Sequence, residues 1–287
     1  MTAQPDGNSF RWGFSTLGCP EMSLPEVCNL LAEFNLCELE IRTLENRVDL
    51  PQWSREHGWT PARAAVLLAL NGIHFRVAGS SFKLVGNDEK SRAELVEFCD
   101  WAESWGARFV RAFGGSSWGQ HLVEKDLEQA AEAVKWWRQE KQKRGWRIEL
   151  LLETHDAFSA SAPCRELQAR LDEPVGIIWD SHHTWRLGGE TPRESWSHLG
   201  PWVRHVHVKD SMLKPSARHP YTYVLPGDGE MPLAETIAVL RENNFSGCVS
   251  FEWEKMWHPY LPSLRDALLR LKTQPWFAPN HELAHAH

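Results

Sequence analysis

Residues 148–180, which read IELLLETHDAFSASAPCRELQARLDEPVGIIWD, contain the pattern that decides the fold. A short apolar run at 148–153 is followed by a helical stretch near 163–170 and then by a second apolar run at 175–180. Strand, helix and strand in this order form the repeating unit of a parallel sheet. The segment therefore predicts a protein of the α/β class.

The same unit recurs along the whole chain. The expected strands are Trp12–Thr16, Cys37–Arg42, Ile73–Gly79, Arg108–Phe113, Ile148–Glu153, Val175–Asp180, Val203–Val208 and Cys248–Trp253. Helices are expected from Ser23, over 61–71, from Asp88, and over 126–143, 163–170, 192–199, 232–243 and 261–271. Eight parallel strands close a barrel, so we predict a (β/α)8 TIM barrel with outer helices. An open doubly wound sheet is the alternative, but no Gly-x-Gly-x-x-Gly turn follows the first strand.

Length, charge and cysteine usage limit the class of protein. The 287 residues suit one barrel, which needs about 250, so we predict a single domain over 1–287. Its core is expected at about 12–271, with disordered termini that include the histidine-rich tail 281–287. The net charge of −7 argues against a protein that binds nucleic acid. The chain has no apolar run long enough to span a membrane, and its N-terminus does not resemble a secretion signal, so we expect neither a membrane protein nor a secreted one. Six scattered cysteines are typical of a reducing cytoplasm, where we expect the protein to work.

Four of the expected strands end on a residue that can bind a metal. Side chains alternate along a strand, and this parity turns Glu153, Asp180, His207 and Glu252 into the barrel at its C-terminal mouth. Three carboxylates and an imidazole placed so close together repel one another unless a cation is present. We therefore predict one divalent ion, with Mn²⁺ first and Mg²⁺, Co²⁺ or Zn²⁺ as alternatives. Any one of the four taken alone would be interpreted as a loop cap or an ion pair.

Further polar residues lie near the same mouth. The expected substrate-binding residues are His183, His155, Lys209, Arg111 and Lys255. Glu40, Arg42 and Asp210 also belong to this group, and each member can equally be a structural ion pair or hydrogen bond. His205, one layer deeper than His207, is interpreted as a satisfied core histidine, and 227–229 as a turn rather than a phosphate cradle.

Several short motifs resemble those of the xylose-isomerase-like TIM barrels, in particular the sugar phosphate isomerase/epimerase family. The motifs are Leu-Glu153-Thr-His155-Asp, Trp-Asp180-Ser-His-His183, His205-Val-His207-Val-Lys-Asp210, Pro226-Gly-Asp-Gly229 and Ser-Phe-Glu252-Trp-Glu. The resemblance implies metal ligation by Glu153, Asp180, His207 and Glu252, with His183 near a substrate hydroxyl. It also implies that Glu153 and Glu252 remove and return a proton through a metal-stabilised enediolate, which isomerises or epimerises a sugar.

Two positions depart from the pattern of the ketohexose 3-epimerases in this group. Those enzymes usually carry a second carboxylate six residues after the first ligand Glu, and an Arg six residues after the ligand His. Ser159 and Leu213 occupy these positions here. The departure favours another sugar, an inositol or a sugar-acid derivative over a free ketohexose.

Three rival functions are compatible with parts of this pattern. A lyase of the same fold would dehydrate a keto-inositol or keto-acid, or cleave a 3-keto-glycoside, with His155 or His183 as base. A trizinc nuclease would need histidines where 78–81 and 113–115 have none, and an Asp-x-His pair that 208–231 lacks. A metal-free sugar-binding barrel is the non-catalytic alternative.

Tryptophans at 136–137 and 253–257 are expected either at a homodimer or homotetramer interface or over the barrel's own core.

Overall fold

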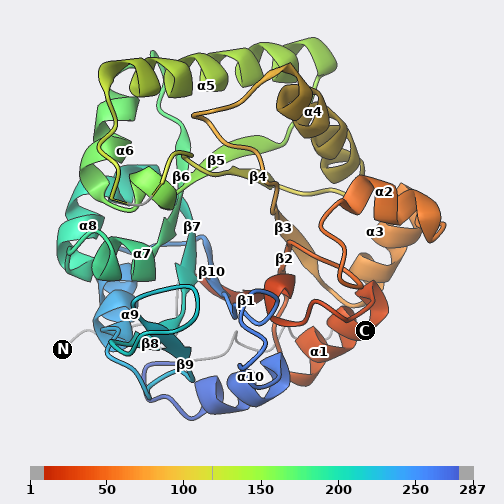
Figure 1. The fold of residues 1–287 in the computed structure, drawn as a ribbon. Helices are drawn as coiled ribbons and strands as arrows, with labels where there is room; N and C mark the ends of the chain where they lie inside the picture. Colours follow the sequence, from red (N-terminus) through yellow and green to blue (C-terminus); the bar gives the residue numbers. More distant parts are fainter. Residues whose placement is uncertain (1–9, 118, 278–287) are drawn as a thin grey trace, which may run out of the picture.

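The computed structural model describes residues 10–117 and 119–277, and its centre is a closed barrel of parallel strands (Figure 1). Around the barrel the strands follow the order β1-β10-β7-β6-β5-β4-β3-β2. Their bounds are β1 Arg11–Ser15, β2 Glu38–Ile41, β3 His74–Ala78, β4 Phe109–Ala112, β5 Glu149–Glu153, β6 Gly176–Asp180, β7 Val203–Val208 and β10 Cys248–Phe251. The predicted (β/α)8 barrel is confirmed, and the predicted strand bounds are correct to within one or two residues.

Helices form a ring around the strands (Figure 1). They are α1 Leu24–Glu33, α2 Leu50–Glu56, α3 Pro61–Leu70, α4 Glu89–Ser104, α5 Glu124–Arg144, α6 Ser161–Gln168, α7 Ser181–Arg186, α8 Pro192–Leu199, α9 Leu233–Glu242 and α10 Leu264–Lys272. The sequence interpretation missed α2 and α7, which are short. It also described the segment after β7 as a loop, whereas this segment contains an antiparallel hairpin of β8 Asp210–Met212 and β9 Thr222–Val224.

Local chemistry explains where several helices begin and end. The side chain of Asp88 accepts the backbone N–H of Ser91 at the start of α4, and Thr191 and Glu194 form a reciprocal capping box at the start of α8. Such caps satisfy N–H groups that have no partner inside the helix. Helix α5 ends at Gly145, whose φ of 70° is a left-handed conformation that glycine adopts without steric cost.

The inward and outward faces of the strands follow the predicted parity. Val77, Leu151 and Ile178 form an apolar cluster inside the barrel, separate from the core between strands and helices. Leu150 and Leu152 belong to that outer core. The residues that continue the inward face toward the C-terminal ends of β5 and β6 are Glu153 and Asp180. The polar mouth therefore lies on an apolar layer.

The burial of the cysteines and tryptophans and the length of the helices bear on the remaining expectations. All six cysteines are buried, as expected for small apolar side chains. Trp137 and Trp253 are buried in the barrel's own core, whereas Trp257 is 37% exposed. None of the helices in the described residues is long and apolar enough to cross a membrane. The tail 281–287, for which disorder is expected, lies outside the described residues.

Candidate metal centre and active site

Four side chains converge at the C-terminal mouth of the barrel. One ligand atom from each of Glu153, Asp180, His207 and Glu252 lies within 4.8 Å of the others. The Nδ1 atom of His207 is 3.2 Å from Glu153 Oε1, 3.5 Å from Glu252 Oε2 and 4.0 Å from Asp180 Oδ2. Neighbouring strands position them, since β6 and β7 pair Asp180 directly with His207. The structure thus brings together the four residues that the sequence selected.

The donor set fits a divalent cation. All four residues are at most 2% exposed, so the charges of the carboxylates are not screened by water. Glu153 Oε2 and Asp180 Oδ2 lie near cationic side chains but meet no donor at a hydrogen-bonding angle. Buried acceptors without a hydrogen bond are rare in proteins and require a reason. Three carboxylates and one imidazole are ligands that Mn²⁺, Mg²⁺, Co²⁺ and Zn²⁺ accept.

A second layer beneath the cluster holds the ring of His207. Glu40, on β2, places Oε2 2.8 Å from His207 Nε2 and 3.1 Å from His205 Nε2. With its Nε2–H donated to Glu40, His207 leaves the Nδ1 lone pair facing the three carboxylates. His205 is buried and bonded as predicted for a core histidine, and its partner is the carboxylate that orients His207.

The electrostatics of the cluster are dominated by carboxylates. Burial disfavours a charged imidazole, but Glu252, Glu40 and Glu153 outweigh it and raise the pKa of His207 well above its ordinary value. Burial raises the pKa of Glu252 to about 7, against the opposing effects of His207 and Lys209. Burial also acts on Glu153, yet Arg111 and His207 hold the pKa of that carboxyl below its usual range. Protons therefore occupy the cluster when no metal does.

Two buried cations flank the cluster. Arg111 Nη1 is 3.2 Å from Glu153 Oε2 and 3.9 Å from Glu252 Oε1. Lys209 Nζ contacts Glu252, lies 2.7 Å from Asp180 Oδ2 and 2.9 Å from Glu254 Oε1. Both cations hold the carboxylates in place and reduce their mutual repulsion.

The short helix α7 connects the cluster to the cavity next to it. Asp180 caps α7 by accepting the backbone N–H of His183 at 3.0 Å. The Nδ1 atom of His183 lies 3.0 Å from both Asp180 Oδ2 and the carbonyl oxygen of Thr154. Burial lowers the pKa of His183 despite Asp180, so this ring is neutral at physiological pH.

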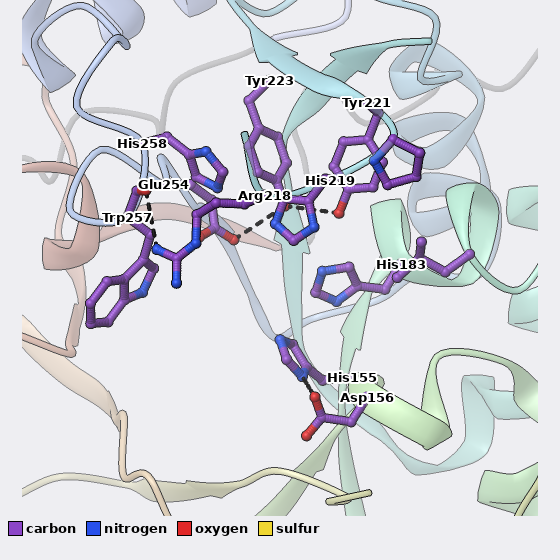
Figure 2. A pocket seen from close by; sticks show the side chains of 12 residues that line it. His155, Asp156, His183, Arg218, His219, Tyr221, Tyr223, Glu254, Trp257 and His258 are labelled. Atoms are coloured by element: carbon purple, nitrogen blue, oxygen red, sulfur yellow. Dashed lines mark hydrogen bonds and ion pairs between the residues drawn. The ribbon is translucent and has the colours of Figure 1, made fainter. Parts of the chain in front are cut away.

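A cavity of about 300 Å³, whose lining residues are drawn in Figure 2, lies next to the cluster, because its lining includes His183, which contacts Asp180, and Glu254, which bonds Lys209. His155 and His183 lie on one side of it, and an aromatic wall from the β8–β9 region and the segment after β10 lies on the other. The residues of this wall are His219, Tyr221, Tyr223, Trp257 and His258. The rings of His219 and Tyr221 stack at 4.8 Å with an interplanar angle of 3°. Glu254 joins the wall to the cluster, because its carboxylate bonds Lys209.

A family model of the xylose isomerase-like TIM barrel matches residues 44–274, which is most of the chain. The chain belongs to this family. The match agrees with the resemblance that the strand-end motifs indicated. Because xylose isomerase-like barrels share a fold and not a single substrate, membership alone does not specify the reaction.

Similar proteins include a C-glycoside deglycosidase subunit and, among solved structures, a probable dehydratase. The chain is 33% identical over 93 residues to the C-glycoside deglycosidase alpha subunit of Arthrobacter globiformis, a match over 32% of this chain and 22% of that protein. The probable 3-DHS dehydratase AsbF of Bacillus anthracis superposes with a TM-score of 0.74 at 16% identity, covering 93% of this chain and 100% of the other. The zinc-bound IolI protein superposes with a TM-score of 0.71 at 18% identity, over 92% and 95% of the two chains.

Two of the five expected substrate-binding residues line the cavity of this xylose isomerase-like barrel. His155 and His183 line the cavity, whereas Lys209 and Arg111 contact the cluster next to it. Lys255 donates to the carbonyl oxygen of Leu261 and is not among the residues that line the cavity. Its role in substrate binding stays a prediction.

The structure also locates Ser159 and Leu213, which depart from the 3-epimerase pattern, and the predicted turn at 227–229. Ser159 is buried and donates to the carbonyl oxygen of Asp156, and Leu213 is 69% exposed. Asp210 accepts the backbone N–H groups of Gly227, Gly229 and Met231, so the predicted turn wraps a carboxylate of the chain itself. A side chain at 229 would overlap that carboxylate, which explains the glycine.

Sequence reasoning missed Glu254 and the histidines and tyrosines of the aromatic wall. The segment that supplies most of the wall was interpreted as a loop, and loop residues have no periodicity from which a direction can be inferred. The signal that could have indicated them is the alternation His219-Pro-Tyr221-Thr-Tyr223, which places rings on one side of an extended strand.

Proposed function

We propose that this chain is a divalent-metal-dependent isomerase or epimerase of a sugar or sugar derivative. The observation that carries the proposal is the convergence of Glu153, Asp180, His207 and Glu252 within 4.8 Å next to a cavity of about 300 Å³. A metal ion held by these four side chains, with Mn²⁺ as our first expectation, would supply Lewis acidity that makes the C–H beside a substrate carbonyl easier to ionise.

The two glutamates have the arrangement that proton transfer requires. Glu153 ends β5 and Glu252 follows β10, with β6 and β7 between them, so they approach His207 from different sides. One carboxylate can remove a proton from carbon and the other can return it. Return to the opposite face of the same carbon gives epimerisation, and transfer between adjacent carbons gives isomerisation. Arg111 lowers the pKa of Glu153, and Arg111 and Lys209 together hold the two carboxylates in position.

The lining of the cavity supports a carbohydrate as the substrate. Apolar ring faces stack on the C–H surfaces of sugars, and the wall offers Tyr221, Trp257 and the neighbouring histidines for this contact. Among the described residues, Arg218 is the one Arg or Lys that lines the cavity, and the acidic residues Asp156 and Glu254 also line it. We therefore infer an uncharged substrate rather than a phosphorylated one. The exposed position of Leu213 in place of an arginine supports a substrate other than a free ketohexose.

A lyase is the second candidate, and one observation favours it. The C-glycoside deglycosidase alpha subunit is 33% identical over 93 residues. Cleavage of a 3-keto-glycoside by this chain would use the same C–H ionisation, followed by loss of the aglycone as leaving group. His183 lines the cavity, and because burial lowers its pKa it is neutral and can serve as the base. Its ring centroid is 4.8 Å from that of His155.

One experiment separates the candidates. The protein is incubated with Mn²⁺ in D₂O with a panel of keto-sugars and 3-keto-glycosides, and products are followed by NMR and mass spectrometry. Isomerisation gives an isomeric sugar with deuterium on carbon, whereas β-elimination gives an unsaturated sugar or a free aglycone. Glu153→Gln and Glu252→Gln should abolish either reaction, and Glu149→Gln, at the far end of β5, is the matched control. Full turnover by both cluster variants would refute the proposal.

A further inference from the structure

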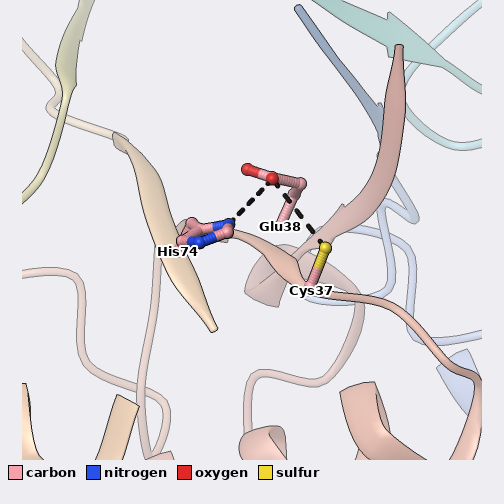
Figure 3. Close-up of side chains that lie close together, drawn as sticks. All are labelled: Cys37, Glu38 and His74. Atoms are coloured by element: carbon pink, nitrogen blue, oxygen red, sulfur yellow. Dashed lines mark hydrogen bonds and ion pairs between the residues drawn. The ribbon is translucent and has the colours of Figure 1, made fainter. Parts of the chain in front are cut away.

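A second group of possible ligands lies at the opposite end of the barrel. Cys37, Glu38 and His74 lie close together where β2 and β3 begin (Figure 3). Glu38 is not available to a metal, because its carboxylate contacts Arg76 and lies 3.3 Å from Arg11 Nη1 and 3.0 Å from His74 Nδ1. Two arginines therefore neutralise the one carboxylate of this cluster.

The same end of the barrel contains a cavity of about 590 Å³ that is strongly cationic. Among the residues that the structure describes, its lining includes one acidic residue, Glu38, and four arginines, Arg11, Arg76, Arg108 and Arg204. Within the described part of the chain, no carboxylate lies within 4.0 Å of the guanidinium of Arg108 or Arg204. The cavity therefore has an excess of positive charge in a protein whose net charge is −7.

The contacts of Arg204 and Arg108 do not cancel their charge. Arg204 Nη1 donates to the carbonyl oxygens of Pro201 and Val203, each at 3.0 Å. The guanidinium of Arg108 lies 5.7 Å from the ring centroid of Phe109, and Arg76 is held by Glu38. Like charges gathered around one cavity repel unless an anion lies between them, and the guanidinium groups of Arg76 and Arg204 are already held in position by hydrogen bonds.

We propose that this cavity binds a small molecule that carries a phosphate group. Guanidinium groups match phosphate oxygens with paired, charge-assisted hydrogen bonds. The volume lies in the range of small-molecule sites, about 300–1,000 Å³. Phe109, Val203 and Phe245 supply an apolar part of the lining for the carbon portion of the ligand. The site lies at the opposite end of the strands from the metal cluster, so it is independent of the proposed reaction.

The test uses pyrophosphate as the probe and isothermal titration calorimetry as the measurement. EDTA is present throughout, so that phosphate does not bind through a metal at the other end of the barrel. Wild type is expected to bind pyrophosphate, and the Arg108→Ala/Arg204→Ala double variant to bind it about tenfold or more weakly. Both side chains are exposed, so the variant should keep the wild-type circular dichroism spectrum and Tm.

A charge-matched control separates a site from general attraction. Arg63→Ala/Arg165→Ala removes the same charge from α3 and α6, outside the cavity, and should bind pyrophosphate like wild type. No binding by wild type, equal weakening in the two double variants, or undiminished binding by Arg108→Ala/Arg204→Ala would each overturn the proposal.

Discussion

Replacing Glu40 by glutamine tests how the barrel orients its proposed metal ligand. Glu40 is 1% exposed, and one of its oxygens lies 2.8 Å from His207 Nε2 and 3.1 Å from His205 Nε2. Glutamine keeps the shape of the side chain but removes its charge, and its single carbonyl oxygen replaces two carboxylate oxygens. The substitution therefore weakens the hydrogen bond that stabilises the Nε2–H tautomer of His207. In that tautomer the lone pair of Nδ1 is free to bind a metal.

The expected magnitude follows from this geometry. Loss of a hydrogen-bonding partner behind a ligand histidine lowers metal affinity by about 10- to 100-fold. That range corresponds to about 1.4–2.8 kcal/mol of binding free energy. Because Glu40 serves two histidines and is fully buried, we expect the upper half of the range.

The assay is competition between the metal-free protein and a chromophoric chelator for Mn²⁺ or Zn²⁺, which needs no substrate. Glu149→Gln, an exposed Glu→Gln change on β5, is the control and should leave affinity unchanged. Circular dichroism and Tm establish that Glu40→Gln is folded. A folded Glu40→Gln protein that binds metal with wild-type affinity would refute the reasoning about His207.

Four further predictions address the ligands, the protons, the stability gained from the metal and the aromatic wall. Glu153→Gln and Glu252→Gln should each lower bound metal measured by elemental analysis, and full metal content in both would exclude the assigned ligand set. Since Glu252, Glu40 and Glu153 raise the pKa of His207 well above its ordinary value, the metal must displace a proton. Affinity should therefore rise with pH, by about tenfold per unit where one proton is displaced, and calorimetry in buffers of different ionisation enthalpy should detect the proton released; an affinity independent of pH between 6 and 8 would contradict this. Removal of the metal by EDTA should lower Tm, since a ligand at a hundredfold excess over Kd stabilises the fold by about 2.7 kcal/mol. Trp257→Ala should raise KM for a carbohydrate more than it lowers kcat, because Trp257 lines the cavity but contacts none of the four cluster residues by hydrogen bond or ion pair; an effect on kcat alone would argue against stacking.

The strands and the four cluster residues followed from the sequence alone. Alternation of side chains is a local property of a strand, so parity placed Leu151 and Glu153 inside the barrel and Leu150 outside it without knowledge of any neighbour. The ends of parallel strands meet at one mouth, and this brought Asp180 to His207. Helix starts at Asp88 and Thr191 were likewise set by residues three positions apart.

The tertiary structure decided what surrounds those four residues. Glu40 and His205 are separated by 165 positions and meet only because the barrel closes. The aromatic wall depends on a hairpin whose direction no periodicity indicates, and the four arginines of the opposite cavity come from separate parts of the chain. Local pattern determines the direction of a side chain, but only closure of the barrel determines its partners, and those partners set the charge of each end.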